Sequence, residues 1–96
     1  MKGFVYLMTN ENNTVLYTGV TSNLKNRSQE HKDKKYSNSF SARYNISKLV
    51  YFEKFMTIGE AIKWEKQIKA GSRRRKLDLI NYTNPEWRDL TGDLDG

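Results

Sequence analysis

Two short runs of apolar, aromatic and β-branched residues near the N-terminus predict a β-hairpin. Residues 4–8 read Phe-Val-Tyr-Leu-Met and residues 15–20 read Val-Leu-Tyr-Thr-Gly-Val. The segment between them, Asn-Glu-Asn-Asn-Thr, is typical of a turn because asparagine tolerates positive φ and bonds to its own backbone. The pattern indicates two antiparallel strands joined by a loop of about five or six residues.

The remainder of the chain predicts helices and one more strand. Thr21 and Ser22 are suited to cap the first helix, and the Ser-rich stretch at 37–41 reads as a loop. Aromatic and branched residues at 46–55 favour a third strand. Three segments are expected to be helical: residues 23–34, a segment that starts at Thr57 or Ile58 and runs to about residue 70, and residues 73–81. The order β-β-α-β-α-α predicts an α+β fold, a small three-stranded antiparallel sheet flanked by helices.

The length of 96 residues predicts one domain, which we place at residues 1–90, followed by a frayed acidic tail at residues 91–96. The sequence has no cysteine, which excludes disulfides and thiolate metal sites. No apolar run approaches the ~18 residues of a membrane helix, and the N-terminus does not read as a signal peptide. We therefore expect a cytoplasmic protein that does not associate with membranes, either a monomer or a weak homodimer.

Charge is unevenly distributed along the chain. Residues 1–83 carry 16 basic and 7 acidic side chains, so +9, whereas residues 84–96 carry 1 basic and 4 acidic, so −3. A positive body attracts the phosphate backbone of nucleic acids through counterion release. A solvated basic surface without a ligand is the alternative interpretation.

One carboxylate interrupts an otherwise apolar helical stripe. Ile58, Ala61, Ile62 and Ile68 follow helical spacing, and Glu65 holds the position that completes the stripe. A carboxylate facing a core is costly unless it is paired or binds a metal. Glu65 is thus a candidate metal ligand, and a glutamate that reaches solvent or pairs with a basic side chain is the alternative.

The first predicted helix has an unusual polar face. Leu24, Arg27, Ser28 and His31 share it by i, i+3, i+4, i+7 spacing. If Leu24 anchors this face to the sheet, Arg27 and His31 point toward the same body. Arginine presents a fork that fits phosphate oxygens, and histidine accepts a proton near neutral pH. A surface histidine is the alternative.

Two tyrosines occupy matching positions on the paired strands. Side chains alternate along a strand, so Tyr6 and Tyr17 each face one side of the hairpin, and Gly19 lies on the same face as Tyr17. They can form a cross-strand core pair or place two phenols in a cleft. Gly19 permits close approach of another group.

The order of these features resembles a known nuclease family. Phe-Val-Tyr-Leu at 4–7, Leu-Tyr-Thr-Gly-Val-Thr-Ser-Asn-Leu at 16–24, and then Arg27 and His31 resemble the core of GIY-YIG nucleases. Residues 61–69 resemble the helix that bears the family's metal-binding glutamate. Residues 84–90, Asn-Pro-Glu-Trp-Arg-Asp-Leu, resemble the end of short stand-alone bacterial members similar to the endonuclease part of the UvrC repair proteins.

The chain departs from the family pattern at positions where side chains only pack. The family takes its name from two residue triplets, GIY and YIG. In the first triplet, Phe4 replaces the glycine and Val5 stands where isoleucine is frequent. In the second triplet, Thr18 replaces the isoleucine. The family's late asparagine corresponds to Asn84 by motif or to Asn81 by distance from Glu65.

The resemblance implies a metal-dependent endonuclease that hydrolyses phosphodiester bonds of DNA. Selectivity for DNA structure and a role in DNA repair or recombination are further expectations from the same resemblance. It implies that Glu65 holds one Mg²⁺ or Mn²⁺ ion, while Arg27 holds the scissile phosphate. Tyr6 is the first candidate general base, with Tyr17 orienting the water and His31 assisting or accepting the proton.

Seven further residues are predicted to contact nucleic acid, DNA first and RNA as the other choice. They are Lys25, Arg43, Lys48, Arg73, Arg74, Arg75 and Asn84. The competing hypothesis is a nucleic-acid-binding module with weak or no cutting activity, since family members usually gain target choice from an appended domain. A third is a structural protein whose basic face meets an acidic partner.

Overall fold

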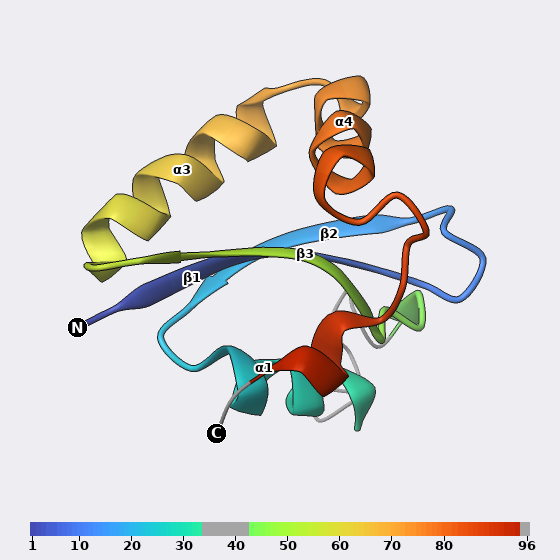
Figure 1. Ribbon diagram of the computed structural model, residues 1–96, viewed down its shortest axis with the longest axis horizontal. Helices are drawn as coiled ribbons and strands as arrows, with labels where there is room; N and C mark the ends of the chain where they lie inside the picture. Colours follow the sequence, from blue (N-terminus) through green and yellow to red (C-terminus); the bar gives the residue numbers. More distant parts are fainter. Residues whose placement is uncertain (34–42, 95–96) are drawn as a thin grey trace.

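A three-stranded antiparallel sheet forms the centre of the protein (Figure 1). The computed structural model describes residues 1–33 and 43–94. The strands lie in the order β2-β1-β3, so β1 is central and β2 and β3 are edges. Their bounds are Gly3–Thr9 for β1, Leu16–Thr21 for β2 and Lys48–Phe55 for β3. The hairpin and its loop at residues 10–15 confirm the sequence prediction.

Helices cover both faces of the sheet. Their bounds are Leu24–Lys32 for α1, Ile58–Ala70 for α3, Arg73–Thr83 for α4, and Leu90–Asp93 for the 3-10 helix η1. In Figure 1, α3 and α4 lie on one side of the sheet, and α1 and η1 lie on the other. The predicted α+β class and element order are confirmed. None of the described helices is long and apolar enough to cross a membrane.

The ends of α1 differ from the prediction. Its cap is Asn23, whose side chain accepts from the backbone N–H of Asn26 at 3.0 Å. Thr21 instead accepts from the N–H of Asn23 at 3.2 Å, so the predicted cap residue stabilises the turn before the helix. The predicted loop at 37–41 lies outside the described residues.

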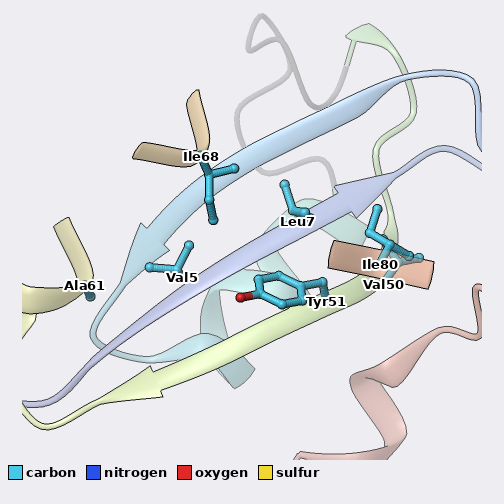
Figure 2. Close-up of a cluster of buried hydrophobic side chains, with 7 residues drawn as sticks. All are labelled: Val5, Leu7, Val50, Tyr51, Ala61, Ile68 and Ile80. Atoms are coloured by element: carbon cyan, nitrogen blue, oxygen red, sulfur yellow. The ribbon is translucent and has the colours of Figure 1, made fainter. Parts of the chain in front are cut away.

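Each face of the sheet carries its own buried cluster. On one face, residues of the strands meet residues of α3 and α4 (Figure 2). We call this set the α3-side cluster: Val5, Leu7, Val50, Tyr51, Ala61, Ile68 and Ile80. On the opposite face lies the α1-side cluster: Tyr6, Met8, Leu24, Ile46 and Leu49. Alternation along β1 divides its residues between the two clusters. Ile62, predicted to join the α3 stripe, is 37% exposed and belongs to neither cluster.

An irregularity in the β1–β3 pairing shifts which residues of β3 face which helix. The register moves between Leu7, which pairs with Tyr51, and Met8, which pairs with Leu49. Val50 is therefore the extra residue of a bulge. Val50 and Tyr51 both join the α3-side cluster, although neighbouring strand residues normally face opposite sides.

The C-terminal segment is tied to the α1 side of the sheet. The Asp89 carboxylate accepts from Lys32 Nζ at 2.6 Å and from the backbone N–H of Leu49 at 3.3 Å. Leu90 and Leu94 pack against the α1-side cluster. The sequence predicts a frayed tail from residue 91, whereas the structure gives residues 91–94 defined contacts because these two leucines find an apolar surface.

Candidate active site

The hairpin register brings the two predicted tyrosines to the α1 side. Tyr6 pairs with Gly19 and Met8 pairs with Tyr17, so both phenols lie over the same face. Their ring centroids are 6.2 Å apart. A Cβ on Gly19 would lie 2.4 Å from Cζ and the hydroxyl oxygen of Tyr6. The glycine therefore leaves the space that the Tyr6 ring occupies.

Helix α1 presents its polar face to these tyrosines. Leu24 and Ser28 are buried and fix the helix, and His31 is only 5% exposed. The Tyr6 hydroxyl lies 3.1 Å from His31 Nε2. The His31 ring meets Tyr6 and Tyr17 edge to face, with centroids 5.8 and 5.1 Å apart. The histidine is thus a buried member of the cluster, which excludes the surface alternative.

Arg27 completes this cluster. Its guanidinium hydrogen-bonds to the hydroxyls of Tyr6 and Tyr17, and Nη1 lies 3.3 Å from Glu30 Oε1. The Arg27 side chain is 35% exposed and Tyr17 is also partly exposed, so both reach solvent beside the buried Tyr6. We call Tyr6, Tyr17, Arg27 and His31 the tyrosine–arginine cluster. It brings together four of the five predicted catalytic residues.

The environment determines the charge of each group. Burial raises the pKa of Tyr6 to about 12, against the opposing effect of the hydrogen bond from Arg27. Burial also lowers the pKa of His31 to about 4, helped by the positive charge of Arg27 and opposed by Glu30. The pKa of Arg27 is raised, chiefly by its hydrogen bond to Tyr6. At neutral pH the cluster therefore holds protonated Tyr6, neutral His31 and charged Arg27.

The protonation states determine which group donates in the Arg27–Tyr6 and Tyr6–His31 hydrogen bonds. The Tyr6 oxygen accepts from Arg27, so its own proton is available to His31 Nε2, which accepts it when the imidazole is neutral. Tyr6 as a free phenolate base is disfavoured at neutral pH by its raised pKa. The pair forms a short proton path from Tyr6 to His31.

The structure places Glu65 in the other helical layer. It lies on the buried side of α3, 9% exposed, and its Oε2 lies 2.8 Å from Nζ of Lys69, which is itself 54% exposed. Helix α3 packs on β1 and β2. The structure therefore does not bring Glu65 into the tyrosine–arginine cluster, because the two lie in layers on opposite faces of the sheet.

The residues present fit a metal held by one protein carboxylate. Among residues 1–33 and 43–94, no group of three or more His, Asp or Glu side chains could cage an ion. Mg²⁺ commonly takes one or two carboxylates and fills its shell with water and phosphate. In the structure Glu65 pairs with the ammonium of Lys69, which is the alternative that the sequence left open, so a metal would have to take the place of this lysine.

The predicted arginines of α4 lie in the α3 layer and make contacts within the protein. Arg73 donates to the Thr14 carbonyl at 3.0 Å, and Arg74 lies 3.4 Å from Asp78. Arg75 lies over the Trp64 ring at 6.0 Å. The structure therefore gives this basic run contacts to the β1–β2 loop, to its own helix and to α3, away from the tyrosine–arginine cluster.

The remaining predicted contacts are divided between exposed and buried positions. Lys25 and Arg43 are exposed, and Lys48 is partly exposed at the start of β3. Asn84 is buried, and its amide is committed, donating to the carbonyls of Val50 at 3.1 Å and Arg88 at 2.9 Å. We therefore assign Asn84 a structural role at the β3 bulge and leave it out of the nucleic-acid contacts.

Asn81, the other candidate for the late asparagine, is exposed and accepts from the Trp87 indole N–H at 2.7 Å. Two lysines that the sequence analysis did not select, Lys2 and Lys54, line a cavity on the α1 side together with Phe4 and Leu24. Lys54 pairs in register with Phe4. Counting back from Tyr6 in steps of two through Phe4 gives Lys2, so strand periodicity could have placed Lys2 on this face but could not have brought it together with Lys54.

Comparison with known proteins agrees with this fold and cluster, which together define a GIY-YIG nuclease-type domain. The family model described as the GIY-YIG catalytic domain matches residues 2–78, and the chain belongs to this family. A UPF0213 protein of Syntrophus aciditrophicus (strain SB) is 40% identical over 85 residues, which is 88% of this chain and 95% of that protein.

Two further relatives extend the likeness to other bacteria. A UPF0213 protein of Staphylococcus haemolyticus (strain JCSC1435) is 37% identical over 79 residues, 82% of this chain and 94% of the relative. The solution NMR structure of the UPF0213 protein BH0048 from Bacillus halodurans has a TM-score of 0.58 and 27% sequence identity, covering 95% of each chain. The chain is thus similar to small bacterial proteins along nearly its whole length.

Proposed function

We propose that this protein is a metal-dependent endonuclease that hydrolyses phosphodiester bonds of DNA. The observation that carries the proposal is the tyrosine–arginine cluster, in which Arg27 contacts Tyr6 and Tyr17 while Tyr6 lies 3.1 Å from His31. Arg27 is partly exposed beside the buried Tyr6–His31 pair, so the set offers a charged group that can bind phosphate next to a proton acceptor. Membership of a nuclease family supports the same reading.

In this proposal Arg27 binds the scissile phosphate. Its guanidinium stays charged, and its partial exposure lets it meet a ligand without losing the tyrosine hydroxyls. Bidentate donors stabilise the extra negative charge that develops on phosphate oxygens in the transition state. Tyr6 and Tyr17 hold the guanidinium in place, because each offers it a phenol oxygen.

Tyr6 and His31 supply the proton path. An attacking water bound at the tyrosine hydroxyls gives its proton to the Tyr6 oxygen while Tyr6 passes its own proton to His31 Nε2. This route avoids a free phenolate, which the pKa of about 12 disfavours. We therefore assign the acceptor role to His31, which is neutral at pH 7 although its pKa of about 4 makes it a weak base, and Tyr17 orients the water.

Glu65 would hold the divalent ion, Mg²⁺ or Mn²⁺. When bound, such an ion supplies stabilisation of the leaving oxygen and of the developing charge. Lys69 must then release the Glu65 carboxylate, which it contacts at 2.8 Å. Because Lys69 is half exposed, its ammonium can move into solvent.

A nucleic-acid-binding module without cutting activity is the second candidate function. The Glu65–Lys69 ion pair favours it, because a lysine that neutralises the carboxylate reduces the need for a metal. Arg27 and the exposed lysines would then bind phosphate without hydrolysis.

The deciding experiment is incubation with plasmid, branched DNA and RNA, with Mg²⁺, Mn²⁺ or chelator. Wild type is compared with Glu65→Gln, Arg27→Lys and the control Glu86→Gln, an exposed glutamate elsewhere. We expect metal-dependent cutting of DNA by wild type and the control, and a loss on the order of 10²–10³ in the two site variants. Equal cutting by wild type and Glu65→Gln would contradict the enzyme and leave the binding module.

A further inference from the structure

We infer that a lysine-lined groove beside the tyrosine–arginine cluster binds the phosphates that flank the cleaved bond. This inference rests on the proposed function, because it takes nucleic acid as the ligand. The groove is a cavity of about 410 Å³ on the α1 side of the sheet. Its wall residues include three lysines and four apolar side chains: Lys2, Lys25, Lys54, Phe4, Leu24, Phe52 and Leu94.

The three lysines reach the groove from separate parts of the chain. Lys2 precedes β1, Lys25 lies in the first turn of α1, and Lys54 lies near the end of β3. The β1–β3 register pairs Lys54 with Phe4, so the fold itself brings these charges together. Their convergence is a property of the tertiary structure and not of a basic run in the sequence.

The positive charge of the groove is not neutralised within the described protein. None of the ion pairs found in residues 1–33 and 43–94 involves Lys2, Lys25 or Lys54. Asp93, the acidic residue of the wall, is bonded to Arg88 at 3.0 Å. Three like charges around one cavity repel each other, and an anion in the groove would relieve this repulsion.

The groove continues the tyrosine–arginine cluster along the same face. Phe4 and Tyr6 are two residues apart on β1, which places them about 7 Å from each other on one side of the strand. On α1, Leu24 and Arg27 are one turn apart. A nucleic-acid strand that places one phosphate at Arg27 would therefore place the neighbouring phosphates beside the lysines.

The lining of the groove matches a nucleic-acid backbone. Ammonium groups act as point charges for phosphate oxygens, and Ser22 and Asn23 add neutral polar groups at the rim. The ammonium of Lys2 lies 5.9 Å from the centroid of the Phe4 ring, so this lysine stands over an aromatic surface. The partly buried ring of Phe52 adds a second flat surface, on which a base can stack. An acidic protein segment would use the lysines but would leave the Phe52 ring unused.

Binding measured without cleavage tests the groove separately from catalysis. Fluorescence anisotropy of a labelled oligonucleotide, single-stranded and duplex, is recorded in chelator over a range of NaCl concentrations. The groove variant is Lys2→Gln/Lys54→Gln. The matched control is Lys63→Gln/Lys66→Gln, which removes the same charge from exposed positions on α3.

We expect the groove variant to bind at least about tenfold more weakly at low salt. Each phosphate contact adds about 0.9 to the slope of log K against log [salt], so the slope should fall by roughly 2. The control should keep the wild-type slope, and thermal melting of both variants should match wild type because the changed side chains are exposed.

Three outcomes overturn the inference in distinguishable ways. If wild type binds and both double variants lose the same affinity, the groove is wrong and the proposed function stands. If wild type neither binds nor cuts any oligonucleotide, the proposed function fails together with the groove. If a polyglutamate peptide binds more tightly than the oligonucleotide and depends on Lys2 and Lys54, the ligand is an acidic protein.

Discussion

Both faces of the sheet are covered, but they differ in what they bury. On the α3 side, Val5 and Leu7 of β1 meet apolar residues of α3 and α4. On the α1 side, Tyr6 of the same strand meets a histidine and an arginine. Burying polar groups is costly unless they are hydrogen-bonded. The fold satisfies this requirement because Arg27 and His31 both bond to Tyr6.

The contrast shows how one strand serves two purposes. The α3 side stabilises the fold through apolar contact, and the α1 side holds chemistry that apolar contact alone cannot provide. Variants on the α3 side should therefore change stability first, and variants on the α1 side should change activity or its pH dependence first.

The largest effect is expected from Leu7→Ala on the α3 side. Leu7 is fully buried, and truncating a core leucine typically costs about 2–5 kcal/mol. Urea denaturation should show this loss, and cutting activity per folded molecule should stay at the wild-type level. A fall in cutting that exceeds the unfolded fraction would show that the two faces are coupled.

Arg27→Ala should give the opposite result. We expect a loss on the order of 10²–10³ in the cutting rate, and a change in the free energy of unfolding below about 1 kcal/mol, because the side chain is partly exposed. The two measurements are single-turnover cleavage and urea denaturation. A stability loss as large as that of Leu7→Ala would mean that the arginine is structural.

His31 should make stability depend on pH. Its folded pKa of about 4 lies below the ordinary value of 6.5, so the unfolded chain binds a proton that the folded protein excludes. Its contribution is fully present above pH 6.5 and is lost as the pH falls toward 4, by an amount on the order of 3 kcal/mol.

The matched comparison is His31→Gln, which cannot titrate. Denaturation at pH 7 and pH 4.5 should show a smaller acid loss in this variant than in wild type. Identical pH dependence would contradict the lowered pKa, because it would mean that His31 takes up a proton as readily in the fold as in the unfolded chain.

Two glycines allow the faces to be tested with the same substitution. A Cβ on Gly19 would meet Tyr6 on the α1 side, and a Cβ on Gly3 would lie 2.9 Å from the Cβ of Ala61 on the α3 side. Each alanine variant should lose about 1–3 kcal/mol through overpacking. Only Gly19→Ala should lower cutting by more than the folded fraction explains, since it displaces the Tyr6 ring.

Much of this structure follows from local signals. The strands, α3 and its start at Ile58 agree with the predictions because alternation, periodicity and the Thr57 cap are encoded within a few residues. Glu65 was predictable because it interrupts an apolar stripe, and Arg27 and His31 because they share a helix face. The family resemblance then predicted that all three residues belong to one catalytic site.

Other features depend on contacts between distant segments. The bulge at Val50 and its bond to Asn84 join β3 to the end of α4. The seating of Leu90 and Leu94 depends on an apolar surface that exists only after the sheet has formed. Lys2 and Lys54 are 52 positions apart in the sequence, so nothing local indicates that they line one groove.

The placement of the two indoles has a practical consequence for spectroscopy. The protein has two tryptophans, Trp64 and Trp87, and both pack against the α3-side cluster. Their emission therefore reports on one half of the molecule. Unfolding should shift it, whereas a ligand docking on the opposite face should leave the wavelength maximum where it is. Intrinsic fluorescence thus offers a readout of folding that can be followed in the same cuvette while a labelled oligonucleotide reports occupancy.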